Sequence, residues 1–486
     1  MAKTIFHSSE SSNFILNMTA EKYNKIASKV LLISCILVSL FAIPSEITYK
    51  TGYVYINCGL AICGVAGMIT ALIAILKKYI HKSMLIPVCS FGFMILWGVL
   101  SLINSYDKNI AFYGSNGRGE GLLALIFYFC MFITAMTLTK ENAIHTVMDS
   151  IVAMGLVNVI WGILQITDIT SSFADSKDYY DYISNVGNIN AASGLCQSPM
   201  FLAMALSLAL MTAITGACIC ESNGRRLIYT LSAILFSFMI MFTYTALGIC
   251  GIILSVIAGI ALIIVKKKDK LNFSKIGCVI ASSLLAVLLA ICNAVGNTGE
   301  YRTYDGNLMW LDSYNRLSSS GIYDAKEINI KSVPEVYGFL TKDTLDIIKQ
   351  YPLLGTGEDN LIYPQIKQSY KIIDNIGTFD RNYNEYLYTG ATRGIPSMIA
   401  LIVLIVSSLA IGVKTVKRNK NENLLIILLV TFCGAILLLI GNSNIVFSPI
   451  FWICTGICAG ADIIKGDETT IKPVQINENR STKKKK

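Results

Sequence analysis

The chain has 486 residues, of which 54% are hydrophobic and 15% are charged, and its mean hydropathy is +0.58. This composition is far more apolar than that of a soluble globular domain, which it excludes. The net charge of +9 is carried mostly by basic segments between apolar runs. We therefore interpret it as a topology signal and expect no nucleic-acid partner.

Apolar runs of about 17 to 25 residues, each long enough to cross a bilayer as a helix, recur along the chain. They lie near residues 28–44, 54–76, 84–104, 121–138, 145–167, 191–215, 227–245, 246–265, 276–295, 394–413, 424–441 and 445–464. The sequence therefore predicts an all-α polytopic membrane protein with about 12 transmembrane helices. A polar arm precedes the first run, and no signal-peptide cleavage motif follows that run.

Basic residues indicate the orientation of the spans. With the N-terminus in the cytoplasm, 26 of the 40 Lys and Arg residues fall on the cytoplasmic side, as in "KKYIHK" (77–82) and "KTVKRNK" (414–420). Of the other 14, ten lie in one long loop, which the positive-inside rule hardly weighs. We therefore expect both termini in the cytoplasm.

That loop, residues 296–393, is far longer than a plain connector, so we expect it to contain structure. Residues 332–350 read as an amphipathic helix that Pro352 ends, with Leu340, Ile347 and Ile348 on its apolar face. The "GTG" at 355–357 predicts a turn and is only a weak phosphate signal. The predicted organisation is a cytoplasmic N-terminal arm (1–27), nine spans (28–295), the extracytoplasmic loop (296–393), three spans (394–464) and a basic cytoplasmic tail (465–486).

Three polar clusters lie on the predicted outer face, each leading into an apolar run. They are "FYGSNGRGE" (112–120), the "YISNVGNIN" cluster (182–190) and the segment from Asp380 to Arg393. The start of a helix offers free backbone N–H groups and the positive end of its dipole, which favour anions. A lipid diphosphate headgroup is the anion expected at that depth.

Cysteines and metal-ligating residues follow no site pattern. The 14 cysteines lie almost wholly in the apolar runs, where cysteine behaves as a small apolar side chain. No disulfide framework or metal-ligand spacing is present. Since no outer cluster has the carboxylate density that a divalent ion requires, we expect neither a metal nor another cofactor.

The polar segments, in this order, resemble the O-antigen ligase and polymerase family of bacterial membrane proteins. The matching segments are "YGSNGRGEGLL" (113–123), "GNIN" (187–190), "YPLLGTGEDN" (351–360) and "DRNYNEYL…TRGIPSMIA" (380–400). The resemblance implies a polytopic protein of the bacterial cytoplasmic (inner) membrane that takes part in cell-envelope polysaccharide synthesis. It further implies transfer of a glycan from undecaprenyl diphosphate to an acceptor at the outer face, with arginines neutralising the departing diphosphate and a base activating the acceptor hydroxyl.

The chain departs from the family at the position of the base. The family usually carries a histidine where this chain has Tyr383, and His7, His81 and His145 all fall on the predicted cytoplasmic side. Two more departures are Thr245-Ala246, where the family tends to have Ser-Arg, and Glu335, where it tends to have an arginine. Because of these changes a non-catalytic homologue that binds, moves or scaffolds lipid-linked glycans remains the alternative to a glycosyltransferase. A small-solute transporter is a weaker third hypothesis, since few charges lie within the spans.

The candidate site residues each have a structural alternative. Arg118, Arg381 and Arg393 are the candidate diphosphate ligands, although Arg118 could be an interfacial anchor. Asn188 and Asn190 could bind sugar or phosphate, or cap the sixth span; Asn384 is a further substrate-binding candidate. Asp380 and Glu385 are the plausible bases, or they only pair with Arg381. Tyr383 is a poor base with an ordinary pKa of about 10, but it could contact a sugar.

Overall fold

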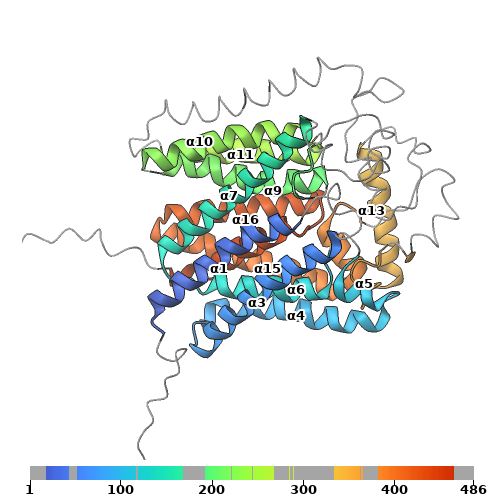
Figure 1. The fold of residues 1–486 in the computed structure, drawn as a ribbon. Coiled ribbons are helices and arrows are strands. Elements are labelled where there is room, and N and C mark those ends of the chain that lie inside the picture. Colours follow the sequence, from blue (N-terminus) through green and yellow to red (C-terminus); the bar gives the residue numbers. More distant parts are fainter. Residues whose placement is uncertain are drawn as a thin grey trace, which may run out of the picture.

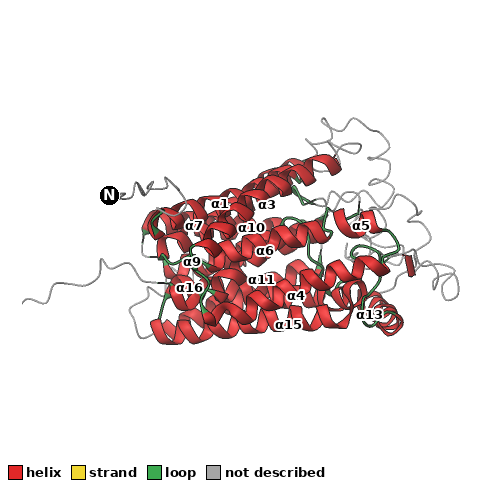
Figure 2. Ribbon diagram, turned by 90° about the horizontal axis from the view of Figure 1, so that it is seen from below, coloured by secondary structure: helices red, strands yellow, loops and turns green. Residues whose placement is uncertain are grey.

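The computed structural model describes residues 18–42, 52–115, 119–167, 192–266 (without 197, 221 and 244), 333–364 (without 362) and 381–464, together with residues 284 and 288. Within these ranges the chain is helical and contains no strand, which confirms the predicted all-α class. The long helices run side by side in one bundle (Figures 1 and 2). The protein is thus a polytopic, multi-pass membrane protein.

The helices follow the predicted spans closely. Eight helices of the described residues are long and apolar enough to cross a membrane, and three shorter apolar helices accompany them. The predicted span 276–295 lies outside the described residues except for two positions. The helices are α1 (Ala20–Phe41), α3 (Gly52–Leu76), α4 (Leu85–Ser101), α5 (Lys108–Tyr113), α6 (Leu122–Met136), α7 (Glu141–Ile166), α9 (Pro199–Ile219), α10 (Asn223–Met241), α11 (Ala246–Lys266), α13 (Val333–Gln350), α15 (Glu385–Asn419), α16 (Glu422–Ile440) and α17 (Phe447–Ala459).

Three helices, α6, α9 and α17, form the inside of the bundle. Every residue of α17 and nearly every residue of α9 is buried, as expected for helices that are apolar on all sides. Small residues let neighbouring backbones approach closely: a Cβ on Gly251 of α11 would lie only 1.9 Å from Ser207 Oγ of α9. The outer helices, such as α4, expose large apolar side chains, which suits contact with lipid.

The two ends of the bundle differ in chemistry. One end, which we call the α13 end, carries α5, α13 and the start of α15 (Figure 1). The opposite end, the basic end, holds His81 before α4 and a network in which Arg225 contacts both His145 and Asp149. These two histidines therefore lie far from the α13 end, because α4 and α7 run between the two ends.

Helix α13 packs on α15 through a small apolar cluster. Leu340, Ile347 and Ile348 are buried, and the last two belong to one apolar cluster with Tyr388 and Ala391 of α15. The helix ends at Gln350, just before Pro352, which confirms the predicted amphipathic helix and its end.

Helix α15 begins nine positions before the predicted span, so the polar segment 385–393 is itself helical. It is interrupted at Gly394, where φ is +83°. A Cβ there would lie 1.9 Å from the carbonyl oxygen of Leu353, and the freed N–H of Ile395 donates to Pro352 O at 2.8 Å. The turn after α13 is therefore packed directly against the break, and the break sets the direction of the residues that precede it.

Candidate functional site

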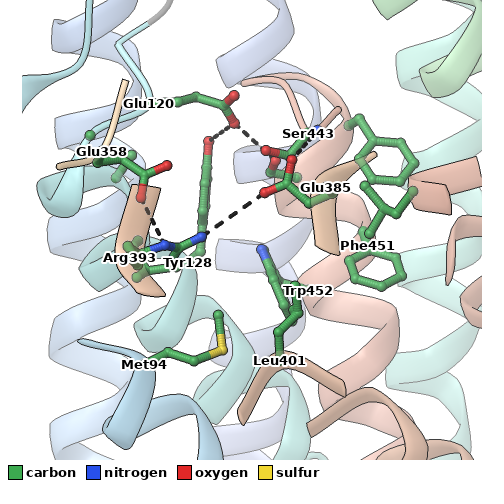
Figure 3. A pocket seen from close by; sticks show the side chains of 16 residues that line it. Met94, Glu120, Tyr128, Glu358, Glu385, Arg393, Leu401, Ser443, Phe451 and Trp452 are labelled. Carbon is green, nitrogen blue, oxygen red and sulfur yellow. Dashed lines mark hydrogen bonds and ion pairs between the residues drawn. The ribbon is translucent and has the colours of Figure 1, made fainter. Parts of the chain in front are cut away.

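A pocket at the α13 end is lined by residues of α4, α6, α15, α16 and α17, of the turn after α13 and of the loop before α17. Its walls divide into a charged part and an apolar part (Figure 3). The charged and polar side chains are Glu120, Tyr128, Glu358, Glu385, Arg393, Ser443 and Ser448. The apolar side chains, which continue toward the middle of the bundle, include Met94, Leu125, Leu401, Leu438, Phe447, Phe451 and Trp452.

Next to the pocket lies a group of buried ionic contacts that we call the Arg381 centre. Arg381 Nη2 lies 3.3 Å from Glu120 Oε2 and 3.2 Å from Asp359 Oδ1, and Nη1 donates to the carbonyl oxygen of Ser443 at 2.8 Å. The guanidinium carbon also lies 4.9 Å from the centre of the Tyr388 ring. The side chains of the arginine and of both carboxylates are at most 6% exposed.

Both carboxylates of the Arg381 centre are saturated with further partners. Glu120 Oε1 accepts from Tyr128 OH at 3.1 Å and from Ser448 Oγ at 2.9 Å. Asp359 accepts from the backbone N–H and the hydroxyl of Ser115 and from Tyr388 OH, at 2.8 to 2.9 Å. The centre therefore joins four separate chain segments. Every oxygen of the two carboxylates has a partner, while Arg381 Nε has no hydrogen-bond partner among the described residues.

A second group, the Arg393 centre, faces the pocket. Arg393 Nε lies 2.8 Å from Glu358 Oε2, and Nη2 lies 4.0 Å from Glu385 Oε1 and donates to Thr389 Oγ1 at 3.1 Å. The arginine is only 5% exposed. Yet Nη1 has no hydrogen-bond partner among the described residues, and the close Nε contact with Glu358 lacks hydrogen-bond geometry. The arginine thus has N–H groups left over for a ligand, in a place where leaving them unpaired is costly.

Glu385 is held by one oxygen only. Its Oε2 accepts from the backbone N–H of Ser443 at 2.9 Å and from Asn442 Nδ2 at 3.3 Å. Its Oε1 is directed toward Arg393 across the pocket (Figure 3). This carboxylate is therefore fixed in direction while one oxygen stays within reach of a molecule in the pocket.

The turn after α13 and the break in α15 position Arg393. The carbonyl oxygen of Thr392 accepts from Gly357 N at 2.9 Å and from Ser101 Oγ of α4 at 2.9 Å. Thr356 N donates to Ala391 O at 3.0 Å, and Gly355 N donates to Tyr351 O at 3.1 Å. The N–H groups of the "GTG" are thus used within the protein, which supports the predicted turn and leaves none of them for a phosphate.

Burial changes the acidity of two carboxyl groups at the pocket. Loss of contact with water raises the pKa of both Glu120 and Glu358 to about 7, against the opposing effect of Arg381 on the first and of Arg393 on the second. The protonated form of each carboxyl group is therefore more accessible near neutral pH than it would be in water.

The structure brings three of the predicted site residues to these centres. Arg381 lies in the Arg381 centre, and Glu385 and Arg393 line the pocket. Asn384 caps α15, because its Oδ1 accepts from Leu387 N at 3.0 Å. Tyr383 is buried with φ +56° and does not line the pocket. Arg118, Asn188, Asn190 and Asp380 lie outside the described residues.

The structural alternative for Asn188 and Asn190 was that one of them caps the sixth span. Helix α9 begins at Pro199, with Ser198 at the N-cap position. The helix starts later than the predicted span because the chain before it, Ser193 and Gly194, is held by the side chain of Gln165. The capping interpretation is therefore wrong.

Sequence reasoning missed the carboxylates Glu120, Glu358 and Asp359, although all three lie in segments that carried the resemblance. Each is a charged residue next to an apolar run, which could have drawn attention to it. In the structure these three carboxylates and Glu385 gather around two arginines, a closeness that the sequence pattern did not predict. Within the described residues no group of His, Cys, Asp and Glu side chains has the arrangement of a metal site.

In a comparison with known protein families, residues 231–402 match the family described as O-antigen ligase. The matched range contains α13, the turn after it and both arginines, and it ends within α15. No curated protein matches the chain. The match supports the family that the polar segments resembled and an O-antigen ligase-type membrane enzyme.

Proposed function

We propose that this chain, a member of the O-antigen ligase family, transfers a glycan from a lipid diphosphate to an acceptor hydroxyl in the pocket beside Arg393. The observation that carries the proposal is the state of Arg393. It is a buried cation with unsatisfied N–H groups, placed where the charged part of the pocket meets the apolar part. Undecaprenyl diphosphate, the carrier that the family implies, has one charged and one apolar part as well.

Arg393 is proposed to bind the diphosphate. Arginine recognises phosphate oxygens with two parallel N–H groups, and such charge-assisted hydrogen bonds are stronger than neutral ones. As the sugar–phosphate bond breaks, negative charge builds up on the departing diphosphate, and a fixed cation stabilises this charge most effectively in a site with little water. The apolar wall formed by Leu401, Phe451 and Trp452 suits the first isoprene units of the lipid.

Glu385 is proposed as the base. In the transfer the acceptor oxygen forms a bond to the anomeric carbon, and the bond from that carbon to the phosphate oxygen breaks, with its electron pair staying on the diphosphate. The proton of the acceptor hydroxyl passes to Glu385 Oε1, whose carboxylate is oriented through Oε2 by Ser443 and Asn442. Of the sequence-predicted bases within the described residues, Glu385 lines the pocket and Tyr383 does not. The identity of the acceptor distinguishes a ligase from a polymerase.

The experiment measures single-turnover transfer from an undecaprenyl-diphosphate-linked glycan by the purified protein. Glu385→Gln keeps the shape of the side chain and removes its basic oxygen, so transfer is expected to slow by at least about a hundredfold with the affinity for the lipid-linked glycan maintained. The matched control is Asp346→Asn, which changes an exposed carboxylate of α13 that pairs with Lys349. Transfer by Glu385→Gln at the rate of the control would exclude Glu385 as the base.

A non-catalytic homologue is the second candidate function. It is favoured by the position of the histidines: His81 and His145 lie at the basic end, and the position aligned with the family histidine holds Tyr383, which does not line the pocket. Release of undecaprenyl diphosphate by the wild-type protein over a range of acceptors would rule this function out. Binding of the lipid-linked glycan without release over that range would favour it.

The proposal places the α13 end outside the cytoplasm and both termini inside. Cysteine would replace Lys349 on α13 or Lys417 near the end of α15, both exposed, in a background without the native cysteines. A membrane-impermeant maleimide is expected to label the Lys349→Cys variant in whole cells and the Lys417→Cys variant only after lysis. The reverse labelling would place the pocket at the cytoplasmic face, where the proposed transfer does not occur.

A further inference from the structure

We infer that Glu358 lies at the place beside Arg393 that a ligand phosphate takes, and that a bound diphosphate displaces it. The inference rests on the proposed diphosphate site. It assigns to Glu358 a positioning role, since this carboxylate keeps Arg393 oriented and charge-compensated until the ligand arrives. The ligand is identified by its chemistry: a diphosphate whose oxygens reach both Nε and Nη1 of the arginine.

Glu358 is the least tightly held carboxylate of the two centres. Its side chain is 13% exposed, against 8% for Glu385, 6% for Glu120 and 0% for Asp359. Among the described residues its carboxylate contacts only Arg393, and that contact lacks hydrogen-bond geometry. The other three carboxylates each accept hydrogen bonds from neighbouring groups. Glu358 is therefore the carboxylate that a ligand can displace at the smallest loss of internal contacts.

The contact with Glu358 leaves the arginine incompletely satisfied. A carboxylate at Nε meets one edge of the guanidinium, while Nη1 has no hydrogen-bond partner among the described residues. A tetrahedral phosphate carries more acceptor oxygens than a carboxylate, and the second phosphate of a diphosphate adds further ones. Exchange of Glu358 for a diphosphate therefore adds hydrogen bonds at a buried cation, which is a source of binding free energy.

The charges around Glu358 make displacement sensitive to protonation. The groups that face it are Arg393 and Glu385 of α15, its neighbour Asp359, and Arg381, with Glu120 in the wall of the same pocket. Carboxylates outnumber arginines in this set. When a diphosphate takes Arg393, Glu358 loses its counter-ion and gains a further anion nearby. Both changes favour the protonated form of its carboxyl group.

The affinity of the protein for a diphosphate is expected to depend on pH through Glu358. Burial raises the pKa of Glu358 to about 7, and a bound diphosphate is expected to raise that pKa further. Below about pH 7 the carboxyl group is already protonated, so binding takes up little additional proton at this group. Above about pH 7, Glu358 must take up a proton when the diphosphate binds. The affinity therefore falls as the pH rises, by at most about tenfold per pH unit.

The test measures the affinity of the purified full-length protein for undecaprenyl diphosphate and, separately, for inorganic diphosphate, at pH 6, 7 and 8. The ligands themselves titrate, so each variant is compared with the wild type on the same ligand. Glu358→Gln resembles the protonated side chain and cannot titrate. Relative to this variant, the wild type is expected to bind about equally at pH 6 and about fivefold or more weakly at pH 8. A parallel result for inorganic diphosphate would assign the effect to the charged subsite; an effect with the lipid alone would show that the apolar wall is needed for binding.

Two further variants separate this role from a merely structural one. Glu358→Asp retains a titratable carboxylate and is expected to retain the pH dependence, whereas Asp346→Asn on the surface of α13 is expected to behave as wild type. Equal pH profiles for the wild type and Glu358→Gln, with both binding the lipid, would overturn the displacement role and leave the proposed function standing. If the wild type binds neither ligand at any pH, the proposed diphosphate site fails together with the inference.

Discussion

Arg381 and Arg393 begin and end the same polar segment, and both are almost fully buried next to carboxylates. Arg381 lies between two carboxylates whose four oxygens all have partners, and its centre joins segments from α5, the turn after α13, α15 and the loop before α17. Arg393 meets one carboxylate closely and one at 4.0 Å. Two of its nitrogens, Nε and Nη1, have no hydrogen-bond partner in the described part of the chain, against one nitrogen, Nε, in Arg381. Two residues of the same type and similar burial thus differ in their partners, and we propose that the first stabilises the fold and the second binds a ligand.

Burial of a charge does not by itself mark a functional residue. A buried ion pair whose groups are fully hydrogen-bonded is neutral or slightly unfavourable for stability, but removal of one partner is strongly destabilising. An incompletely paired buried cation is tolerated where a ligand completes it. The number of guanidinium nitrogens with hydrogen-bond partners, two in Arg381 and one in Arg393, therefore separates the two arginines more clearly than their exposure does.

Arg381→Ala is expected to have the largest effect. It leaves Glu120 and Asp359 buried without their cation, so the free energy of unfolding should fall by about 3–5 kcal/mol. Thermal unfolding in detergent would measure the loss. The control is Arg225→Ala at the basic end, which removes a half-exposed contact with Asp149 and should lower the free energy of unfolding by less than about 1 kcal/mol. Equal losses for the two variants would contradict the structural role of the Arg381 centre.

Arg393→Ala is expected to weaken binding more than folding. Loss of charge-assisted hydrogen bonds should lower the affinity for undecaprenyl diphosphate by about 10- to 100-fold. The loss of thermal stability should be smaller than that of Arg381→Ala, because Glu358 is more exposed and can take up a proton. Arg393→Lys, which keeps the charge and loses the two-pronged geometry, should fall between wild type and Arg393→Ala. Unchanged affinity in Arg393→Ala would exclude the pocket as the diphosphate site.

Glu120→Gln tests the electrostatics of the Arg381 centre. Burial raises the pKa of Glu120 to about 7, above its ordinary value of about 4.3, so between these values the folded protein binds more protons than the unfolded one. The free energy of unfolding therefore falls as the pH rises from about 4.5 to 7. Glu120→Gln cannot titrate at this position. Its free energy of unfolding should therefore fall less over this pH range than that of the wild type, by roughly 1–3 kcal/mol. Thermal unfolding curves at a series of pH values would measure this difference. The same dependence of stability on pH in the wild type and the variant would contradict the prediction.

Tyr128→Phe is expected to have the smallest effect. It removes the hydrogen bond from the tyrosine hydroxyl to Glu120, while Ser448 still donates to the same carboxylate oxygen. The free energy of unfolding should fall by about 1 kcal/mol, and less when Glu120 is already Gln, because the two groups interact directly. A double-mutant cycle in thermal unfolding measures this coupling. Strictly additive losses would mean that the contact contributes nothing to the centre.

The fold could be predicted in some detail from the sequence. Eleven of the predicted spans correspond to helices, α13 ends before Pro352 as expected, and the "GTG" forms a turn with Gly355 and Gly357 at positive φ. These features depend on local chemistry. A run of apolar residues has to satisfy its backbone as a helix in a membrane, and a proline or a glycine acts on its immediate neighbours.

The residues of the two centres could be predicted only in part. Arg381, Glu385 and Arg393 were singled out from the sequence, because charged residues beside an apolar run stand out, and the structure places them at the two centres. Their partners were not: Glu120 lies 261 positions before Arg381 in the chain, and Ser448 lies 328 positions after Glu120. Nothing in the spacing of these residues indicates that they meet.

The sequence by itself determined the class of the protein, most of its helices, the difference between a basic end and an end rich in polar clusters, and the segments that carry the arginines. Only the tertiary structure decided that Arg381 pairs with Glu120 and Asp359, that Arg393 faces a pocket with two nitrogens that have no hydrogen-bond partner among the described residues, and that Glu358 lies beside it. The physical reason is that hydropathy acts over neighbouring residues, whereas compensation of a buried charge depends on which distant segments the packing of helices brings to within about 3 Å.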